Sequence, residues 1–455
     1  PANLAAMHKH HIEPIALVCV NLYPFEQTIA KPDCSFAEEI ENIDIGGQAM
    51  IRSAAKNHRS VVVVTDPLQY EKVLKHLRAG QGQTPYAFRL DLAMWAYTRT
   101  AQYDAAIYPY LAAAYFKEKP ERTAEQAGLL PALTPRLTKR QDLRYGENPH
   151  QAAAFYATPS GASGIATAGQ LHGKALSYIN ILDADAAIEL VREFAQPAAA
   201  VIKHTNPCGC AVADTPARAF ELAYAGDPVA AFGGIVALNR EVDEQTASNI
   251  VSGKRFLEVV IAPGYAPAAL QMLRDRWKDC RILATGALDG ARQAHELQYR
   301  SVAGGVLVQQ GDRAGFDQAG CNVTSGRKPT AEEWEALGFV WLATKHVKSN
   351  AVAIAARGEH GVQLLASGAG QMSRPMSAKI AVELANANGH AERLRGAVAG
   401  SDAFFPFPDA PEILIAAGIT AIIHPGGSKK DQETVDLCNR HGVALVATGQ
   451  RHFAH

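Results

Sequence analysis

The sequence predicts an α/β protein with more than one domain. Two short apolar runs, 15–20 and 61–64, alternate with segments of helical periodicity, and such alternation implies a parallel sheet. A third run of small and aliphatic residues, 198–202, is typical of a buried strand. At 455 residues, the chain is long enough to bury a large core and to form two or more domains.

The composition is that of an ordinary globular protein and excludes several classes of function. Apolar residues make up 48% of the chain and charged residues 20%. The net charge of −1 argues against nucleic-acid binding, which normally requires a basic excess. No apolar run reaches the length of a membrane span, and no signal-peptide pattern opens the chain. The seven scattered cysteines fit free thiols in a reducing compartment, so the predicted location is the cytoplasm.

Residues 1–116 are predicted to form part of an α/β domain. The strand at 15–20 ends in Asn21-Leu-Tyr23, helices follow at 36–43 and from Asp44 onward, and a second strand occupies 61–64. Asp44 and Ile45 precede two glycines at a helix start, where free N–H groups suit an anion or a sugar hydroxyl. Simple N-capping by Asp44 is the commoner role of such a residue. Alone, this region indicates only a nucleotide-binding fragment.

Residues 117–136 are predicted to be a linker, because charges and prolines occur there without periodicity. The segment 143–151 then places Arg144 and Tyr145 close to Asn148-Pro-His-Gln. A guanidinium fork and an aromatic face in one loop suit a phosphate or a planar ring.

The buried strand at 198–202 is followed by Lys203 and His204, and these two residues are the strongest catalytic candidates. Adjacent side chains of a regular strand point to opposite faces, so the pair can serve one site only where the strand ends. We expect Asn206-Pro-Cys-Gly209 to turn the chain there. The end of a buried strand is also a common ligand position in α/β folds.

Four ordered motifs, at 143–151, 181–187, 203–209 and 401–409, together resemble the bifunctional purine biosynthesis family, which joins AICAR transformylase to IMP cyclohydrolase. The segments 368–374, 424–428 and 451–455 match the same family, and the resemblance runs from about residue 10 to the last residue. It implies an incomplete methylglyoxal-synthase-like parallel-sheet domain at 1–116. It also implies a transformylase domain at 137–455, built of two cytidine-deaminase-like α/β halves.

The resemblance implies an enzyme that transfers the formyl group of 10-formyltetrahydrofolate to the 5-amino group of AICAR and cyclises the product, FAICAR, to IMP. It further implies a homodimer with active sites at the interface and no required metal.

In the transformylase site, His204 is implied as general base, with Lys203 and Asn350 as stabilising groups. The AICAR-binding residues carried over by the resemblance are Arg144, Tyr145, Phe404 and Arg451. The folate-binding residues are Asp409, Ser428, Lys429 and, from across the dimer, Arg374. The cyclohydrolase residues are Asn21, Tyr23, Asp44, Ile45 and Lys56.

Two other functions stay open on the residues alone. His204 with Cys208 and Cys210 faintly resembles a zinc-dependent nucleotide deaminase, although one residue separates the two cysteines here, where the deaminase signature has two. A non-catalytic nucleotide-binding subunit is the third hypothesis. A short similarity between Lys203-His204-Thr-Asn206 and 345–350 suggests an internal duplication.

By the same resemblance, we expect the first domain to lack roughly the opening third or more of the family's cyclohydrolase domain. A truncated parallel sheet exposes an unpaired edge and loses core. We therefore expect ring closure to be impaired in the chain as written.

Overall fold

The computed structural model describes residues 2–159, 162–288 and 297–455, which form two compact units. Unit 1 takes its described residues from Pro1–Arg136 and Leu297–Gln310, and unit 2 from Leu137–Glu296 and Gly311–His455. Each unit has its own hydrophobic core. Among the helices of the described ranges, none combines the length and the apolar character that a membrane crossing requires.

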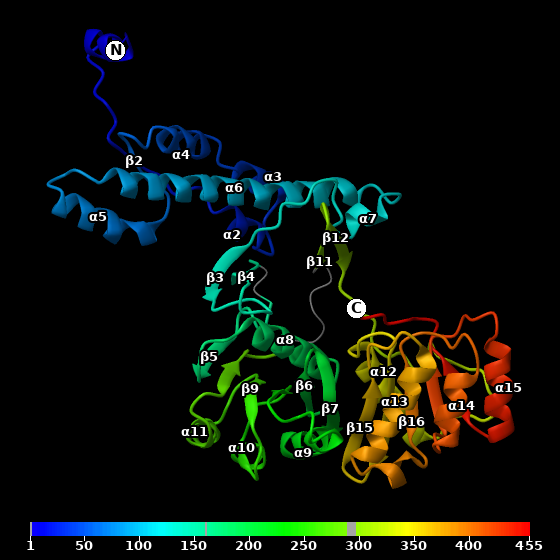
Figure 1. The fold of residues 1–455 in the computed structure, drawn as a ribbon. Coiled ribbons are helices and arrows are strands. Elements are labelled where there is room, and N and C mark those ends of the chain that lie inside the picture. Colours follow the sequence, from blue (N-terminus) through cyan, green and yellow to red (C-terminus); the bar gives the residue numbers. More distant parts are fainter. Residues whose placement is uncertain (1, 160–161, 289–296) are drawn as a thin grey trace. The chain divides into compact units, whose positions relative to one another are not determined.

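Unit 1 is mainly helical, with a small parallel sheet. Its core centres on Phe25, Ile51, Val63 and Leu92, and α4 and β2 pack against the long helix α6 (Figure 1). Strands β1 and β2 pair in parallel, as the alternation of strands and helices predicted. The elements are α1 (Ala2–Lys9), β1 (Leu17–Cys19), α2 (Phe25–Ile29), α3 (Phe36–Glu41), α4 (Gly46–Lys56), β2 (Val62–Val64), η1 (Pro67–Gln69), α5 (Tyr70–Ala79), α6 (Tyr86–Lys117), α7 (Thr123–Gln126), β11 (Leu297–Val302) and β12 (Gly305–Gln310).

Two segments of unit 1 have features that the sequence did not reveal. Residues 117–136 include the short helix α7 and an ion pair between Arg136 and Glu26. The antiparallel hairpin β11–β12 also belongs to unit 1, although unit 2 supplies the chain on both sides of it. The Gln310 side-chain amide donates to the carbonyl oxygen of Ala127, which links the hairpin to the segment after α7.

Unit 2 is a mixed α/β fold built on one large mixed sheet. The sheet has 12 strands in the order β13-β18-β17-β16-β14-β15-β7-β6-β8-β9-β10-β5. The elements are β3 (Thr138–Leu143), β4 (Ala153–Ala157), β5 (Gly169–His172), α8 (Tyr178–Arg192), β6 (Ala198–Lys203), β7 (Asn206–Ala213), α9 (Pro216–Gly226), β8 (Gly234–Leu238), α10 (Glu244–Val251), β9 (Leu257–Ala262), α11 (Pro267–Arg276), β10 (Arg281–Ala284), β13 (Asn322–Val323), α12 (Ala331–Lys345), β14 (Val352–Gly358), β15 (Gly361–Gly368), α13 (Arg374–Ala387), η2 (Ala391–Leu394), β16 (Val398–Ser401), α14 (Asp409–Ala416), β17 (Ala421–His424), α15 (Asp431–His441) and β18 (Ala444–Ala447).

The sheet of unit 2 contains an internal repeat. From β5 to β10 the elements follow the order β-α-β-β-α-β-α-β-α-β, and the same order recurs from β13 to β18 if the short helix η2 is set aside. The strand pairings match as well: for example, β6–β7 and β14–β15 are antiparallel hairpins, and β8–β9 and β16–β17 are parallel. The halves join through antiparallel pairing of β7 with β15. Helices α8 and α12 share one core on one face of the sheet, and the other helices of each half form separate cores.

The structure supports the duplication but not the sequence similarity that suggested it. Lys203–Asn206 connects β6 to β7, whereas residues 345–350 lie between α12 and β14. The true counterpart of the β6–β7 turn is the β14–β15 turn at Glu359-His360. The similarity of the two Lys-His segments was therefore a wrong guide to equivalent positions.

Candidate functional site

Strand β6 ends in a two-residue turn formed by His204 and Thr205. Lys203 pairs with Asn206 across the hairpin, and both turn residues have positive φ, 54° and 60°. Positive φ at both central positions is the geometry of a type I′ hairpin, which matches the right-handed twist of the flanking strands. The chain thus reverses at His204, at the end of a buried strand.

The predicted turn at Asn206-Pro-Cys-Gly209 was wrong, because these residues belong to β7. Pro207 is accommodated where the register between β6 and β7 shifts, next to Ile202. Gly209 is needed for packing: a Cβ there would lie 1.8 Å from the carbonyl oxygen of Ala223 in α9.

Asp183 of α8 accepts hydrogen bonds from both residues of the turn. Its Oδ1 accepts a hydrogen bond from the Thr205 amide at 2.7 Å, and its Oδ2 accepts one from the His204 amide at 3.2 Å. The side chain of Asn206 donates to the His204 carbonyl oxygen at 3.0 Å. Asp183 lies in the 181–187 motif, but nothing in its sequence neighbourhood revealed this role.

The two candidate catalytic residues are consecutive: Lys203 ends β6, and His204 is the first residue of the turn. The Lys203 ammonium donates to the Phe232 carbonyl oxygen at 2.8 Å, and the residue is half-buried. His204 is exposed, so its imidazole is available to a ligand.

A second segment, Lys348–Asn350, docks against this turn. The Lys348 amide donates to Asn206 Oδ1 at 3.0 Å, and the Lys348 ammonium donates to the His455 carbonyl oxygen. The Asn350 side chain donates to the Gln371 carbonyl oxygen at 2.8 Å. Asn206 therefore ties the position of His204 to the segment that carries Asn350.

Arg374 is buried within its own chain, with 6% of its surface exposed. Its guanidinium forms an ion pair with the fully buried Asp402 and donates to Asn350 Oδ1 at 2.8 Å. It also donates to Ser401 Oγ at 2.8 Å. These bonds position Asn350, and the predicted contact of Arg374 with folate across a dimer stays a prediction.

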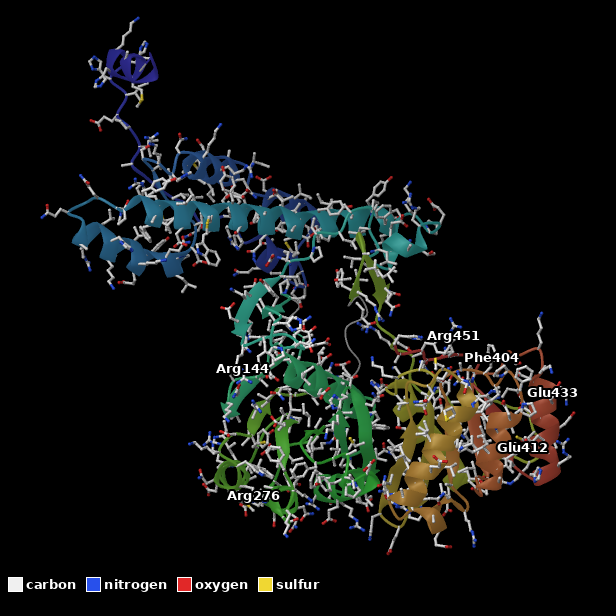
Figure 2. All side chains as sticks on the ribbon, in the orientation of Figure 1. Arg144, Arg276, Phe404, Glu412, Glu433 and Arg451 are labelled. Atoms are coloured by element: carbon white, nitrogen blue, oxygen red, sulfur yellow. The ribbon has the colours of Figure 1, made fainter. Side chains whose placement is uncertain are left out.

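Phe404 and Arg451 lie on two loops of the second half that are bonded to each other. The His452 amide donates to the Asp402 carbonyl oxygen at 3.0 Å, which ties the C-terminal segment to the loop after β16. Phe404 is 39% exposed and Arg451 is exposed with its guanidinium over the Phe453 ring (Figure 2). An aromatic face and a cation are thus both presented to solvent.

Arg144 and Tyr145 follow β3 and contact each other. The Arg144 guanidinium donates to the Tyr145 hydroxyl at 2.9 Å and lies 4.7 Å from the centre of its ring. The Gln151 side chain closes the loop by accepting from the Asn148 amide at 2.9 Å. A contact of this pair with His204 stays a prediction.

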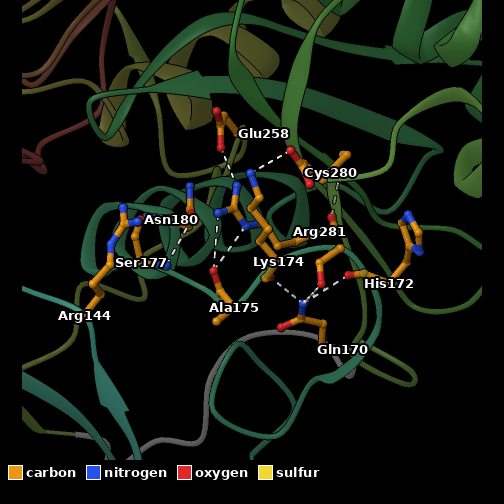
Figure 3. A network of polar contacts seen from close by, with 12 residues as sticks. Arg144, Gln170, His172, Lys174, Ala175, Ser177, Asn180, Glu258, Cys280 and Arg281 are labelled. Atoms are coloured by element: carbon orange, nitrogen blue, oxygen red, sulfur yellow. Dashed lines mark hydrogen bonds and ion pairs between the residues drawn. The ribbon is translucent and has the colours of Figure 1, made fainter.

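A polar network fixes the chain that leads into α8 (Figure 3). Arg281 forms an ion pair with Glu258 and donates to the Ala175 carbonyl oxygen at 3.3 Å. Ser177 and Asn180 then form a capping box at the start of α8. Because α8 carries Asp183, this network also fixes the residue that holds the His204 turn.

The three predicted folate residues of the second half lie beside helix starts. Asp409 is the first residue of α14 and accepts from the Ala410 amide. Ser428 precedes α15, and its hydroxyl accepts from the Lys430 amide at 3.1 Å. Lys429, between Ser428 and Lys430 in the sequence, is exposed. Nearby, burial lowers the pKa of His424 from 6.5 to about 4.

The predicted cyclohydrolase residues of unit 1 separate into two groups. Asp44 accepts from the Gly47 amide at 2.6 Å and from the Tyr23 amide at 3.3 Å, so its carboxylate satisfies an N–H group in the first turn of α4 and fixes the loop after β1. Asn21 donates to the Tyr70 hydroxyl at 3.1 Å, and Tyr23 and Ile45 are exposed. Lys56 is exposed at the opposite end of α4. Its participation with the others stays a prediction.

The zinc hypothesis gains no support from the cysteines. Burial raises the pKa of the Cys208 thiol to about 12, and Cys210 lies in the apolar core of unit 2 with its pKa raised as well. A zinc ligand must be the thiolate. Within the described part of the chain, no three His, Cys, Asp or Glu side chains are grouped to hold a metal.

Comparison with known proteins gives consistent matches. A family model described as AICARFT/IMPCHase bienzyme matches residues 54–384. Three relatives carry the name bifunctional purine biosynthesis protein PurH. That of Halalkalibacterium halodurans is 50% identical over 454 residues, covering 100% of this chain and 84% of its own. That of Shouchella clausii is 48% identical, covering 98% and 82%, and that of Bacillus subtilis (strain 168) is 45% identical, covering 100% and 84%. A crystal structure of ForH is 38% identical over 23% of this chain and 55% of its own, with a TM-score of 0.22, and supports no structural argument.

Proposed function

This chain belongs to the AICARFT/IMPCHase bienzyme family, and we propose that its unit 2 transfers the formyl group of 10-formyltetrahydrofolate to the 5-amino group of AICAR. The product is FAICAR, and the reaction belongs to purine biosynthesis, as the name of the relatives states for them. The observation that carries the proposal is the bonding of the exposed His204 turn, through Asn206, to the Lys348–Asn350 segment.

His204 acts as the general base. The amine of AICAR is a weak nucleophile, because its lone pair delocalises into the ring and the carboxamide. Its nitrogen forms a bond to the formyl carbon while His204 removes its proton, and the bond from the formyl carbon to N10 of the folate then breaks. The folate nitrogen takes up a proton as it leaves.

Lys203 and Asn350 stabilise the negative charge that develops on the formyl oxygen. A donor placed for this purpose lowers the activation barrier by about 3 kcal/mol. The Lys203 ammonium lies at the end of β6, and the Asn350 amide is oriented by Arg374. Both groups in this structure donate to backbone carbonyl oxygens, which substrate oxygens can replace.

The binding charge comes from arginine and lysine side chains, because both substrates are anionic. We assign Arg144, Tyr145, Phe404 and Arg451 to AICAR, and Asp409, Ser428 and Lys429 to folate. The exposure of Phe404, Arg451 and Lys429 supports this assignment. Arg374 supports the site by orienting Asn350.

We assign ring closure of FAICAR to unit 1, with Asn21, Tyr23, Asp44, Ile45 and Lys56 as its residues. The convergence of Tyr23 and Asp44 after β1 supports a site at this end of the small parallel sheet. The proposed domains are 1–116 and 137–455. The assay below also measures ring closure.

We further propose a cytoplasmic homodimer with active sites at the interface and cytidine-deaminase-like halves in unit 2. The repeated order of elements supports the second point. Met372 is fully exposed beside Arg374, which fits a surface that a second copy covers.

The decisive experiment compares the native protein with His204→Ala in an assay that follows both formyl transfer and ring closure. Removal of a general base should lower the rate of formyl transfer by about 10²–10⁴-fold, while AICAR binding persists. The matched control is His360→Ala, which removes an exposed histidine from the corresponding turn of the second half. Unchanged transfer by His204→Ala would refute the assignment of the base. AICAR binding without any transfer by the native protein would instead indicate a non-catalytic subunit.

A further inference from the structure

We propose that Asp183 is a positioning residue for formyl transfer, because its carboxylate holds the His204–Thr205 turn in a conformation that these residues otherwise avoid. The proposal rests on the proposed function, since it concerns how His204 is presented to the substrate. It adds a residue on α8, outside the strand ends that carry the reacting groups.

The turn is strained by its own sequence. Two consecutive residues other than glycine have φ of 54° and 60°. Type I′ turns usually contain Asn-Gly or Gly-Gly, because the left-handed region crowds a Cβ atom. Thr205 is β-branched, for which this region is a marked outlier. Such a conformation persists only where surrounding contacts enforce it, and it is concentrated at functional sites.

Asp183 supplies those contacts with two oxygens. The adjacent amides of His204 and Thr205 both point at one carboxylate, at 3.2 and 2.7 Å. Asp183 is 5% exposed, so these bonds form away from water and are strengthened by the negative charge. An asparagine has one acceptor oxygen, so its NH₂ group would have to face one of the two N–H donors.

The second half of unit 2 shows that the fold does not require this strain. The corresponding β14–β15 turn connects Gly358 to Gly361 through Glu359 and His360. Within the described ranges, the residues other than glycine with positive φ are His11, Gln81, His204 and Thr205, so neither Glu359 nor His360 adopts it. The strained turn is thus confined to the half that carries His204.

The carboxylate acts through the backbone. Its two described bonds go to amide groups, and the bond from Asn206 to the His204 carbonyl oxygen fixes the other side of the same residue. Asp183 therefore orients His204 without touching the substrate. If it acts in this way, a change that makes the left-handed turn easy should replace it.

The test is a double-mutant cycle of Asp183→Asn and Thr205→Gly in the full chain. In the native background, Asp183→Asn should lower kcat by about 10²-fold, the usual effect of displacing a catalytic group by about 1 Å, with little change in KM for AICAR. Glycine adopts the left-handed region without crowding. In the Thr205→Gly background, the same Asp183→Asn change should therefore lower kcat by a much smaller factor. An equal loss in both backgrounds would overturn the positioning role.

Hydrogen exchange provides a readout that does not depend on activity. The amides of His204 and Thr205 should exchange much faster in Asp183→Asn than in the native protein. The matched control is Asp243→Asn, because Asp243 accepts from the Thr246 amide at the start of α10 and lies away from the turn. It should change neither kcat nor the exchange of these two amides.

The outcomes separate the two proposals. Native kcat and native amide protection in Asp183→Asn would refute the positioning role and leave the formyl-transfer proposal standing. Absence of transfer in the native protein would refute the proposed function, and the exchange measurement would still decide whether Asp183 holds the turn. If Asp183→Asn lowers the thermal unfolding midpoint as Asp243→Asn does, the comparison of the two backgrounds still isolates the turn.

Discussion

At the scale of single residues, burial decides the ionisation of His424. This residue ends β17 and packs its ring 5.2 Å from that of Phe405, and its Nδ1 is buried without a hydrogen-bond partner. Burial lowers its pKa from 6.5 to about 4, which outweighs the opposing influence of Asp431. The folded protein therefore holds a neutral imidazole where the unfolded chain would already be protonated.

The consequence is a loss of stability in mild acid. The unfolded chain binds more protons than the folded chain between pH 6.5 and about 4, so stability is complete above pH 6.5 and falls as the pH falls. This lowering of the His424 pKa corresponds to about 3 kcal/mol in the free energy of unfolding. His424→Gln should remove this part of the slope, as measured by urea unfolding of unit 2 at several pH values. Identical slopes in the two proteins would contradict it.

Residues whose role depends on a chemical pattern could be predicted, and residues whose role depends on distant backbone could not. Lys203 and His204 were identified from their place after an apolar run, and the structure puts them at the end of β6. The role of Asp183 could not be predicted, because its partners are backbone amides about twenty positions away in the sequence. Arg374 was predicted to bind a ligand, but it is bonded to the buried Asp402, which no spacing rule suggested.

At the scale of elements, two glycines let helices approach strands in the same way in both halves. A Cβ at Gly209 in β7 would lie 1.8 Å from the carbonyl oxygen of Ala223 in α9. A Cβ at Gly368 in β15 would lie 1.9 Å from that of Ser377 in α13. Both oxygens belong to helix backbone, which cannot move aside without displacing the helix.

Gly209→Ala and Gly368→Ala should each destabilise unit 2 by about 1–3 kcal/mol, the usual cost of overpacking. Gly315→Ala is the control, because a Cβ there meets no atom within 4 Å. That substitution should be neutral or slightly stabilising. Urea midpoints of the three variants check the prediction, and equal midpoints for all three would contradict it.

The elements themselves were predictable where periodicity is strong. The predicted strands at 61–64 and 198–202 and the helix predicted from Asp44 onward appear in the structure with small changes of boundary. The start of β7 at Asn206-Pro-Cys-Gly209 could not be predicted, since proline and glycine usually break a strand. Here the shift in register and the approach of α9 give both residues a place inside β7.

At the scale of the whole molecule, each unit buries its own core. The core of unit 1 is formed by residues between Leu22 and Ala106, and the largest core of unit 2 lies between Ala184 and Val446. Independent cores usually allow independent folding. The repeat in unit 2 was predicted only through a similarity at non-equivalent positions. The structure shows it instead in the order of the elements and strands of the two halves.

A chain of residues 137–455, with the hairpin 297–310 replaced by a short glycine-serine linker, should therefore keep formyl transfer and lose ring closure. The same dual assay measures both, with circular dichroism as a check of folding. Loss of transfer in a folded product would mean that unit 1 contributes to the transferase site.

The hairpin β11–β12 also has a consequence for synthesis. Unit 1 begins at the start of the chain, yet its last two strands are residues Leu297–Gln310. A ribosome must therefore translate all of β5 to β10 before the earlier unit can be completed. Until then, the nascent chain contains unit 1 without the hairpin β11–β12, whose residues lie within the sequence of unit 2.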